Sequence, residues 1–220
     1  MAKYPIYLVK AKSQYALTST FLRFQEHYES PKFRGKVFDL EDFMDWYAST
    51  RNGKFSYFSD WAGFNFPSSI LKPFKTNAFY PMLKKERRLL QVLEGIPEPF
   101  YVIGVFEPIR MSTVRHEIVH GLFYTDEEYR KKVLECIRTV DTKAFWKILK
   151  KIGYSHSVLE DEINAYAVAD ISTLTEDGLK EKLAKQAQQT LRKVFVDHFG
   201  FSIARMEENE LLKLVHVKRL

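Results

Sequence analysis

Aromatic residues are concentrated in the first half of the chain, and this constrains its fold more than any other feature. Of the 33 aromatic residues, 23 lie within residues 1–106, and the densest run covers 55–67. Side chains of this size are either packed in a core or exposed on a binding surface. No Lys or Arg interleaves the rings of the dense run, which disfavours a surface for stacking bases or sugars. We expect a small aromatic core that also forms the wall of a cleft.

Hydrophobic periodicity divides the chain into a mixed first half and a helical second half. Apolar runs predict strands at 5–10 and 100–106, and helical spacing predicts helices at 15–27, 39–47 and 83–93. From residue 112 onward the pattern is helical. Capping boxes at 125–128 and 157–160 start helices through about 139 and 170, Asp141 or Thr142 caps another that Gly153 ends, and a long helix covers 179–198. This segregation of strands and helices indicates an α+β fold.

The composition excludes several classes of protein. The chain has 220 residues, of which 45% are hydrophobic and 28% charged, and this suits one globular domain. No apolar run reaches the roughly 18–20 residues that span a bilayer, and the start of the chain lacks the features of a signal peptide. Cys136 is the only cysteine, so an intrachain disulfide and a cysteine-rich zinc site are excluded. We therefore expect a cytoplasmic protein with no membrane segment.

The basic residues give no specific signal for a nucleic-acid partner. The net charge is +6, and the Lys and Arg residues are spread over several segments with helical periodicity. Such a distribution is typical of solvated helix faces rather than of a binding patch for a polyanion. The oligomeric state is left open by the sequence.

Residues 116–120 form an HExxH motif, in which His116 and His120 flank Glu117 and two apolar residues. Histidines at positions i and i+4 lie about 40° apart around a helix, so both imidazoles can reach one metal ion. The glutamate then lies near a water molecule on the ion, whose pKa zinc lowers to about 7. The motif thus predicts two zinc ligands and one general base.

The helix around the motif has a second face that is apolar. Val114, Ile118 and Leu122 follow one another at intervals of four residues, on the side opposite the two histidines. The helix can therefore bury its back against a core while the histidines face a cleft. A chance occurrence of HExxH is the alternative, and it has no reason to coincide with this amphipathic pattern.

Glu162 is the candidate for the third ligand. On a helical wheel, Val158, Leu159, Ala165, Tyr166 and Ala169 surround it, whereas Glu160, Asp161 and Asn164 project elsewhere. A carboxylate in an apolar stripe must be paired with a basic group or bound to metal. An ion pair with a Lys or Arg across a helix interface is therefore the alternative to metal binding.

HExxH followed by a helix that carries Glu162-x-x-Ala165 resembles the gluzincin group of zinc metallopeptidases. The resemblance covers 116–123 and 158–169 and implies a zincin-like fold, with Zn²⁺ bound by His116, His120 and Glu162 and with Glu117 as general base. In that group an Asp or Asn four residues after the ligand glutamate often orients a histidine. Tyr166 stands at that position here, so Asp170 or Asn164 is expected to take this role.

Other residues remain candidates near the site. His156, Tyr154 and Tyr166 are candidates to stabilise the oxyanion of a tetrahedral intermediate. Asp126 falls where one variant of another zincin group has an aspartate ligand, although Phe123 replaces the glycine of that pattern.

The sequence therefore predicts a zinc-dependent peptidase in which Glu117 activates water against a peptide or protein substrate. We expect a single zincin-like domain over 1–220, with an aromatic-rich lobe in 1–106, metal-binding helices in 107–173 and a C-terminal helix and tail in 174–220. The alternatives are a regulatory or sensor protein with a zincin fold and restricted or no proteolysis, and a non-catalytic binding module that uses the aromatic lobe.

Overall fold

The computed structural model describes residues 3–152, 154 and 156–220. The chain divides into two compact units, which are described separately. The sheet unit contains residues 1–109 and 215–220, and the helical unit contains residues 110–214. The mixed α and β content agrees with the α+β class predicted from the sequence. Nowhere in the described ranges is a helix long and apolar enough to cross a membrane.

One mixed sheet forms the centre of the sheet unit, and within the described residues it has four strands in the order β2-β3-β1-β4. The strands are β1 (Ile6–Ala11), β2 (Gly63–Pro67), β3 (Tyr101–Phe106) and β4 (His216–Arg219). β1 runs parallel to β3 and to β4, with Ile6 opposite Tyr101 and Tyr7 opposite His216, whereas β2 is antiparallel to β3. Both central strands, β1 and β3, are mostly buried, which explains their nearly continuous apolar sequences.

Short and long helices complete the sheet unit: α1 (Gln14–Glu29), α2 (Leu40–Ser49), α3 (Tyr57–Asp60), η1 (Ser68–Leu71), α4 (Lys72–Lys75) and α5 (Lys84–Val92). α1 begins after Ser13, whose hydroxyl accepts a hydrogen bond from the backbone N–H of Ala16. It packs against β2 and β3. The sheet thus supports α1 along the face that the aromatic residues fill.

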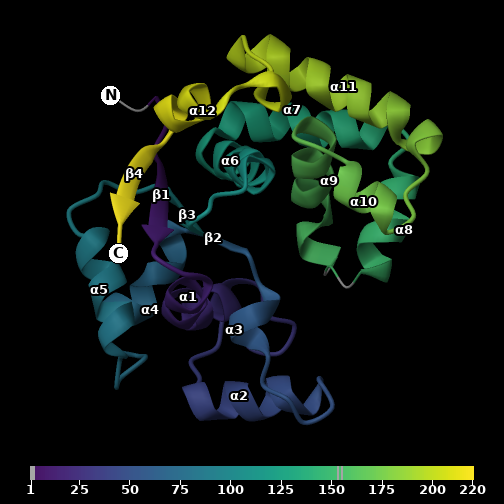
Figure 1. Ribbon diagram of the computed structural model, residues 1–220. Helices are drawn as coiled ribbons and strands as arrows, with labels where there is room; N and C mark the ends of the chain where they lie inside the picture. The colour runs from purple at the N-terminus through teal and green to yellow at the C-terminus, as the bar shows by residue number, and fades with distance from the viewer. Residues whose placement is uncertain (1–2, 153, 155) are drawn as a thin grey trace. The chain divides into compact units, whose positions relative to one another are not determined.

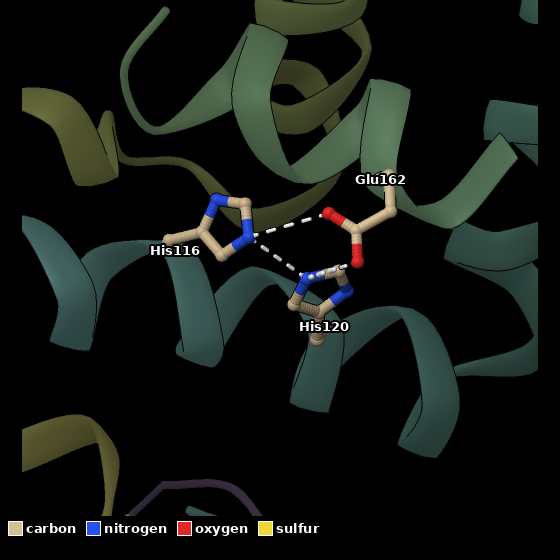
Figure 2. Close-up of side chains that lie close together, drawn as sticks. All are labelled: His116, His120 and Glu162. Atoms are coloured by element: carbon tan, nitrogen blue, oxygen red, sulfur yellow. Dashed lines mark hydrogen bonds and ion pairs between the residues drawn. The ribbon is translucent and has the colours of Figure 1, made fainter. Parts of the chain in front are cut away.

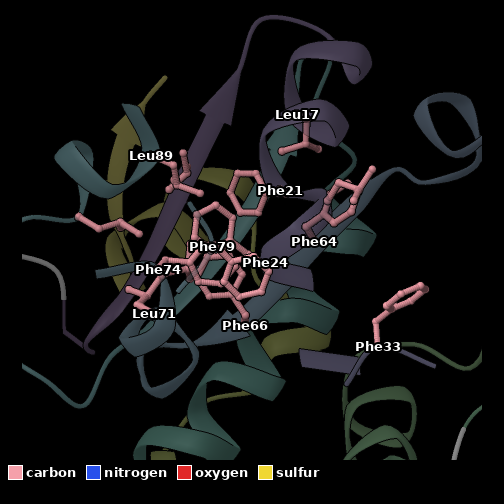
Figure 3. Packing of buried hydrophobic residues seen from close by; sticks show 14 of the residues in the cluster. Leu17, Phe21, Phe24, Phe33, Phe64, Phe66, Leu71, Phe74, Phe79 and Leu89 are labelled. Atoms are coloured by element: carbon pink, nitrogen blue, oxygen red, sulfur yellow. The ribbon is translucent and has the colours of Figure 1, made fainter. Parts of the chain in front are cut away.

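The predicted aromatic core is confirmed (Figure 3). Phe24, Phe74 and Phe79 stack on one another, with ring centroids 4.1 Å and 4.0 Å apart. Phe21 and Phe66 extend this stack toward the strands. All five rings are buried within the sheet unit. The further expectation that this lobe forms the wall of a cleft stays a prediction.

The described part of the helical unit contains helices and their connecting segments, and no strand (Figure 1). They are α6 (Met111–Thr125), α7 (Glu127–Thr139), α8 (Lys143–Lys151), η2 (His156–Val158), α9 (Leu159–Val168), α10 (Ser172–Glu176), α11 (Glu181–Phe199), η3 (Ile203–Arg205) and α12 (Glu208–Leu214). α9 packs against α6, α7, α8 and α11. It therefore lies at the centre of this unit, next to the helix that carries the HExxH motif.

Two helix starts differ from the sequence predictions. The capping box at 125–128 is wrong, because Asp126 caps α7 by accepting a hydrogen bond from the backbone N–H of Tyr129 at 2.9 Å. The box at 157–160 is replaced by the short 3₁₀ helix η2, so that α9 begins at Leu159. Gly153, the expected end of the preceding helix, lies outside the described residues. The segment at 203–220 forms η3, α12 and β4, and none of these was predicted.

Candidate metal centre

α6 presents its two histidines on one face and its apolar residues on the other, as the HExxH spacing predicts. Val114, Ile118 and Leu122 are fully buried. His120 is also buried, and His116 is partly exposed, with 17% of its side-chain surface accessible. The helix is therefore held by its apolar back, and both imidazoles are free to point toward α9.

His116, His120 and Glu162 converge on one point between α6 and α9 (Figure 2). The Nε2 atoms of the two histidines lie 3.0 Å apart. Glu162 Oε2 lies 3.5 Å from His116 Nε2, and Glu162 Oε1 lies 3.6 Å from His120 Nε2. Zn–N distances of about 2.0–2.1 Å in a tetrahedral site put neighbouring ligand atoms about 3.3 Å apart. The three side chains are thus spaced as ligands of one ion.

The carboxylate of Asp161 lies beside the imidazole of His120. His120 Nδ1 lies 2.9 Å from Asp161 Oδ1, so the carboxylate favours the tautomer with N–H at Nδ1. A neutral imidazole has one N–H and one lone pair, and the lone pair of His120 then lies at Nε2. This lone pair faces the carboxylate oxygens of Glu162. The electron-rich nitrogen and oxygen atoms repel one another unless a proton or a cation lies between them.

Charge and burial act in opposite directions on this group. Burial disfavours the protonated form of His120, but Asp161 and Glu162 outweigh it and raise the pKa of His120 well above its usual value. Burial favours the neutral form of Glu162, but His120 and His116 together lower its pKa below the ordinary value. The carboxylates around His120 therefore favour a positive charge beside them, which a proton on His120 or a bound cation can supply.

The surroundings of Glu162 fit a metal ligand better than a partner in an ion pair with Lys or Arg. Its Oε2 atom is buried and accepts no hydrogen bond from any residue that the structure describes. In the same described ranges its ionic partners are the two histidines, and neither Lys nor Arg pairs with it. A buried carboxylate oxygen in this state is costly unless an ion binds it. The donor set of two imidazoles and one carboxylate suits zinc.

A cavity of about 220 Å³ adjoins the histidine face of α6. It is lined by Ser112, Thr113, His116, Glu117, Tyr154, Tyr166, Asp170 and Thr173. The Tyr166 ring packs against His116 with centroids 4.4 Å apart, and its hydroxyl lies 3.2 Å from that of Tyr154. Burial raises the pKa of Tyr166 to about 12 and also raises the pKa of Tyr154. Both phenols are therefore protonated donors at neutral pH.

Several residues that the sequence placed near the site lie elsewhere in the helical unit. His156 is exposed and packs on the Trp146 ring, with centroids 4.9 Å apart. Asp126 caps α7, and its other oxygen lies 2.9 Å from His198 Nε2. Asn164 accepts a hydrogen bond from the Tyr129 hydroxyl at 2.8 Å. The structure therefore groups none of these three with the candidate ligands.

Asp161 is the functional candidate that sequence reasoning missed. It was expected to project away from the ligand face of its helix, but it lies against His120. Asp170, which was expected to orient a histidine, lines the cavity and accepts hydrogen bonds from Ser172. The acidic pair at positions 161 and 162 was the one sequence signal that could have found this contact. Comparisons of the chain with protein-family models, curated proteins and solved structures gave no match.

Proposed function

We propose that this chain is a zincin-like, gluzincin-type zinc peptidase in which His116, His120 and Glu162 hold the ion. One observation carries the proposal: three lone-pair atoms from the HExxH helix and from α9 approach one another at ligand spacing, with an unsatisfied carboxylate oxygen among them. When bound, zinc supplies a Lewis acid and lowers the pKa of a coordinated water toward about 7.

In this proposal Glu117 is the residue that moves the proton of the reaction. It follows His116 on α6, is 8% exposed and lines the same cavity as His116 and the two tyrosines. As a carboxylate it accepts a proton from the attacking water and passes it to the leaving amine. The Glu117 side chain contributes no ligand atom to the group of three, so in this proposal its role is separate from metal binding.

In the same proposal Tyr154 and Tyr166 stabilise negative charge on the carbonyl oxygen of the substrate. Their hydroxyls lie in the cavity, and their raised pKa values keep them protonated. A preformed donor at the developing oxyanion typically contributes about 10²–10³-fold in rate. His156 is exposed and outside the lining of this cavity, so the two tyrosines are the stronger candidates.

The size of the cavity favours one alternative, a regulatory or sensor protein with restricted proteolysis. Ligand cavities usually have volumes of about 300–1,000 Å³. The space beside Glu117 within the helical unit is smaller, about 220 Å³. A protein that cleaves one short segment of one partner needs less room than a general peptidase. The number of different peptides that the protein cleaves therefore distinguishes the regulatory alternative from a general peptidase.

Zinc content tests the ligand set. Protein purified without added zinc should contain about one zinc per chain, whereas His120→Ala and Glu162→Ala should bind it far more weakly. Glu160→Ala is the matched control, since Glu160 is exposed and lies two residues before Glu162, on the opposite side of α9. Affinities are measured by competition with a chelator on variants that circular dichroism shows to be folded. Equal, near-zero zinc in all four proteins after reconstitution would reject the metal centre.

Glu117→Gln separates the chemistry from metal binding. The amide keeps the shape of the side chain but cannot accept a proton, so this variant should retain zinc and lose about 10²–10⁴-fold in rate. Cleavage of a mixed peptide library, followed by mass spectrometry, supplies the substrate. Zinc binding with equal cleavage by wild type and Glu117→Gln would remove the assigned role. Zinc binding with cleavage of no peptide would favour the regulatory alternative.

A further inference from the structure

A second cavity of the helical unit, of about 740 Å³, is lined by basic side chains. α6 contributes Arg115, α11 contributes Arg192 and Lys193, and η3 contributes Arg205. These residues are far apart in the sequence, so no local charge cluster announces the site. The fold alone assembles three guanidinium groups around one space.

The charges that line this cavity do not balance. Lys193 forms an ion pair with Asp197 four residues later on α11, and these two charges offset each other. Asp170 is then the remaining carboxylate of the lining against the three arginines. In the described part of the chain, none of the three arginines has a carboxylate within ion-pair distance. The cavity therefore carries an excess of two positive charges.

Backbone carbonyls, rather than carboxylates, hold two of these guanidinium groups in position. Arg115 Nη2 donates to the carbonyl of Met206 at 2.8 Å, and Arg192 Nε donates to the carbonyl of Ala167 at 2.9 Å. The Nε of Arg115 is buried without a partner in the described structure. Each anchored guanidinium keeps further N–H groups, because arginine has five donors in a planar fork.

The arginines also repel one another. Burial and the charge of Arg205 lower the pKa of Arg192, and the attraction of Asp170 does not cancel this. Bringing like charges together in a partly buried place is unfavourable unless an anion lies between them. A doubly charged oxyanion would neutralise the excess and would accept hydrogen bonds from several guanidinium forks.

We infer that the Arg115–Arg192–Arg205 cavity binds the phosphate group of a small phosphate monoester. A phosphate monoester carries about −1.5 to −2 charges at neutral pH, which matches the excess of the lining. The volume lies within the range of about 300–1,000 Å³ typical of small-molecule sites, so the cavity accommodates an organic group in addition to the phosphate. Val196 and Ala204 supply apolar surface for that group. The inference does not depend on the proposed peptidase activity.

Isothermal titration calorimetry with phenyl phosphate and with inorganic phosphate tests this inference. The protein is first treated with a chelator, which removes any metal that could itself bind phosphate. Phenyl phosphate should bind one site per chain, and inorganic phosphate should compete for that site. Arg192→Gln and Arg205→Gln should each weaken binding at least about tenfold, since a hydrogen bond to a charged group is lost. Lys185→Gln on α11 is the matched control, because Lys185 is exposed and outside the lining.

Each other outcome counts against the inference. No saturable binding of either phosphate probe by the wild type overturns it, as does equal binding by the arginine variants and by Lys185→Gln. Citrate and benzoate serve as carboxylate probes, and tighter binding of these than of phenyl phosphate would reassign the site to carboxylates. Arg205 is exposed at the end of η3, so its variant stays informative even if Arg192→Gln fails to fold.

Discussion

Asp161 and Glu162 are neighbours in α9, yet their carboxylates meet different atoms of the two histidines. Glu162 approaches both Nε2 atoms, whereas Asp161 approaches Nδ1 of His120 from the other side. The two acidic residues therefore have separate roles in the proposed centre. Glu162 supplies a ligand atom, and Asp161 orients His120 so that its lone pair points at the ion.

Replacing Asp161 should weaken zinc binding without removing a ligand. Carboxylates that orient a metal-binding histidine typically contribute about 10–100-fold to metal affinity. We expect this loss for Asp161→Ala, a smaller loss for Asp161→Asn, whose amide oxygen can still accept from Nδ1, and none for Glu160→Ala. Chelator competition at constant pH measures the affinities. Wild-type affinity in Asp161→Ala would show that the carboxylate does not orient His120.

A buried ion pair is the corresponding residue-scale feature of the sheet unit. Arg23 on α1 and Glu86 on α5 are 3% and 1% exposed. Arg23 Nε donates to Glu86 Oε1 at 2.6 Å, and Glu86 Oε2 also accepts from the backbone N–H of Leu83 at 2.8 Å. The pair therefore ties the start of α5 to α1.

Removing one member of this pair should destabilise the sheet unit strongly. Glu86→Ala leaves a guanidinium group buried without its carboxylate, at an expected loss of about 3–5 kcal/mol in the free energy of unfolding. The double variant Arg23→Met, Glu86→Leu should recover much of that loss, because it buries no charge. Urea unfolding of the three proteins measures the effect. A loss below about 1 kcal/mol in Glu86→Ala would mean that water reaches the arginine.

At the scale of elements, local sequence patterns predicted the positions of helices and strands that are defined by their own residues. β1, β3 and α11 were predicted near their observed positions because periodicity and terminal residues define them, as Gly200 does in the left-handed conformation after α11. Helix geometry and a helical wheel were enough to predict that His116, His120 and Glu162 form one group. The contact of Asp161 was missed because it depends on how α9 crosses α6. β4 was missed because it pairs with a strand from the other end of the chain.

Gly104 shows how closely two elements of the sheet unit approach each other. A Cβ atom at this position of β3 would lie 2.7 Å from Cζ of Phe21 and 2.9 Å from Cδ1 of Leu17, both on α1. These distances are well inside normal van der Waals contact. Glycine at 104 therefore allows α1 to pack directly on the strand.

Adding a methyl group at this position should push α1 away from β3. We expect Gly104→Ala to lower the free energy of unfolding by about 1–3 kcal/mol, the usual cost of overpacking. The same substitution in a Phe21→Leu background should cost less, because the smaller side chain makes room. A double-mutant cycle from urea unfolding measures the coupling. Additivity within about 0.3–0.5 kcal/mol would show that Phe21 does not set the spacing.

At the scale of the whole molecule, the chain passes between its two units twice. It leaves the sheet unit after Ile109 and returns at Val215. The whole helical unit therefore lies between β3 and β4 in the sequence, although both strands belong to one sheet. The predicted boundary at 106 lies close to the first crossing. The second crossing has no counterpart in the predicted division at 173, because a four-residue edge strand leaves little trace in the sequence.

The helical unit should carry the proposed metal centre by itself. His116, His120, Glu162 and Asp161 all lie within residues 110–214, and so do the buried apolar residues that hold α6 against α9. A unit of about 100 residues is within the size range of independently folding domains. We expect the fragment 110–214 to be helical by circular dichroism, to unfold cooperatively and to bind zinc within a few-fold of the affinity of the full chain. His116→Ala in the fragment is the control for specific binding. An unfolded fragment would refute the independence of this unit, whereas a folded fragment and a full chain that both fail to bind zinc would refute the metal centre instead.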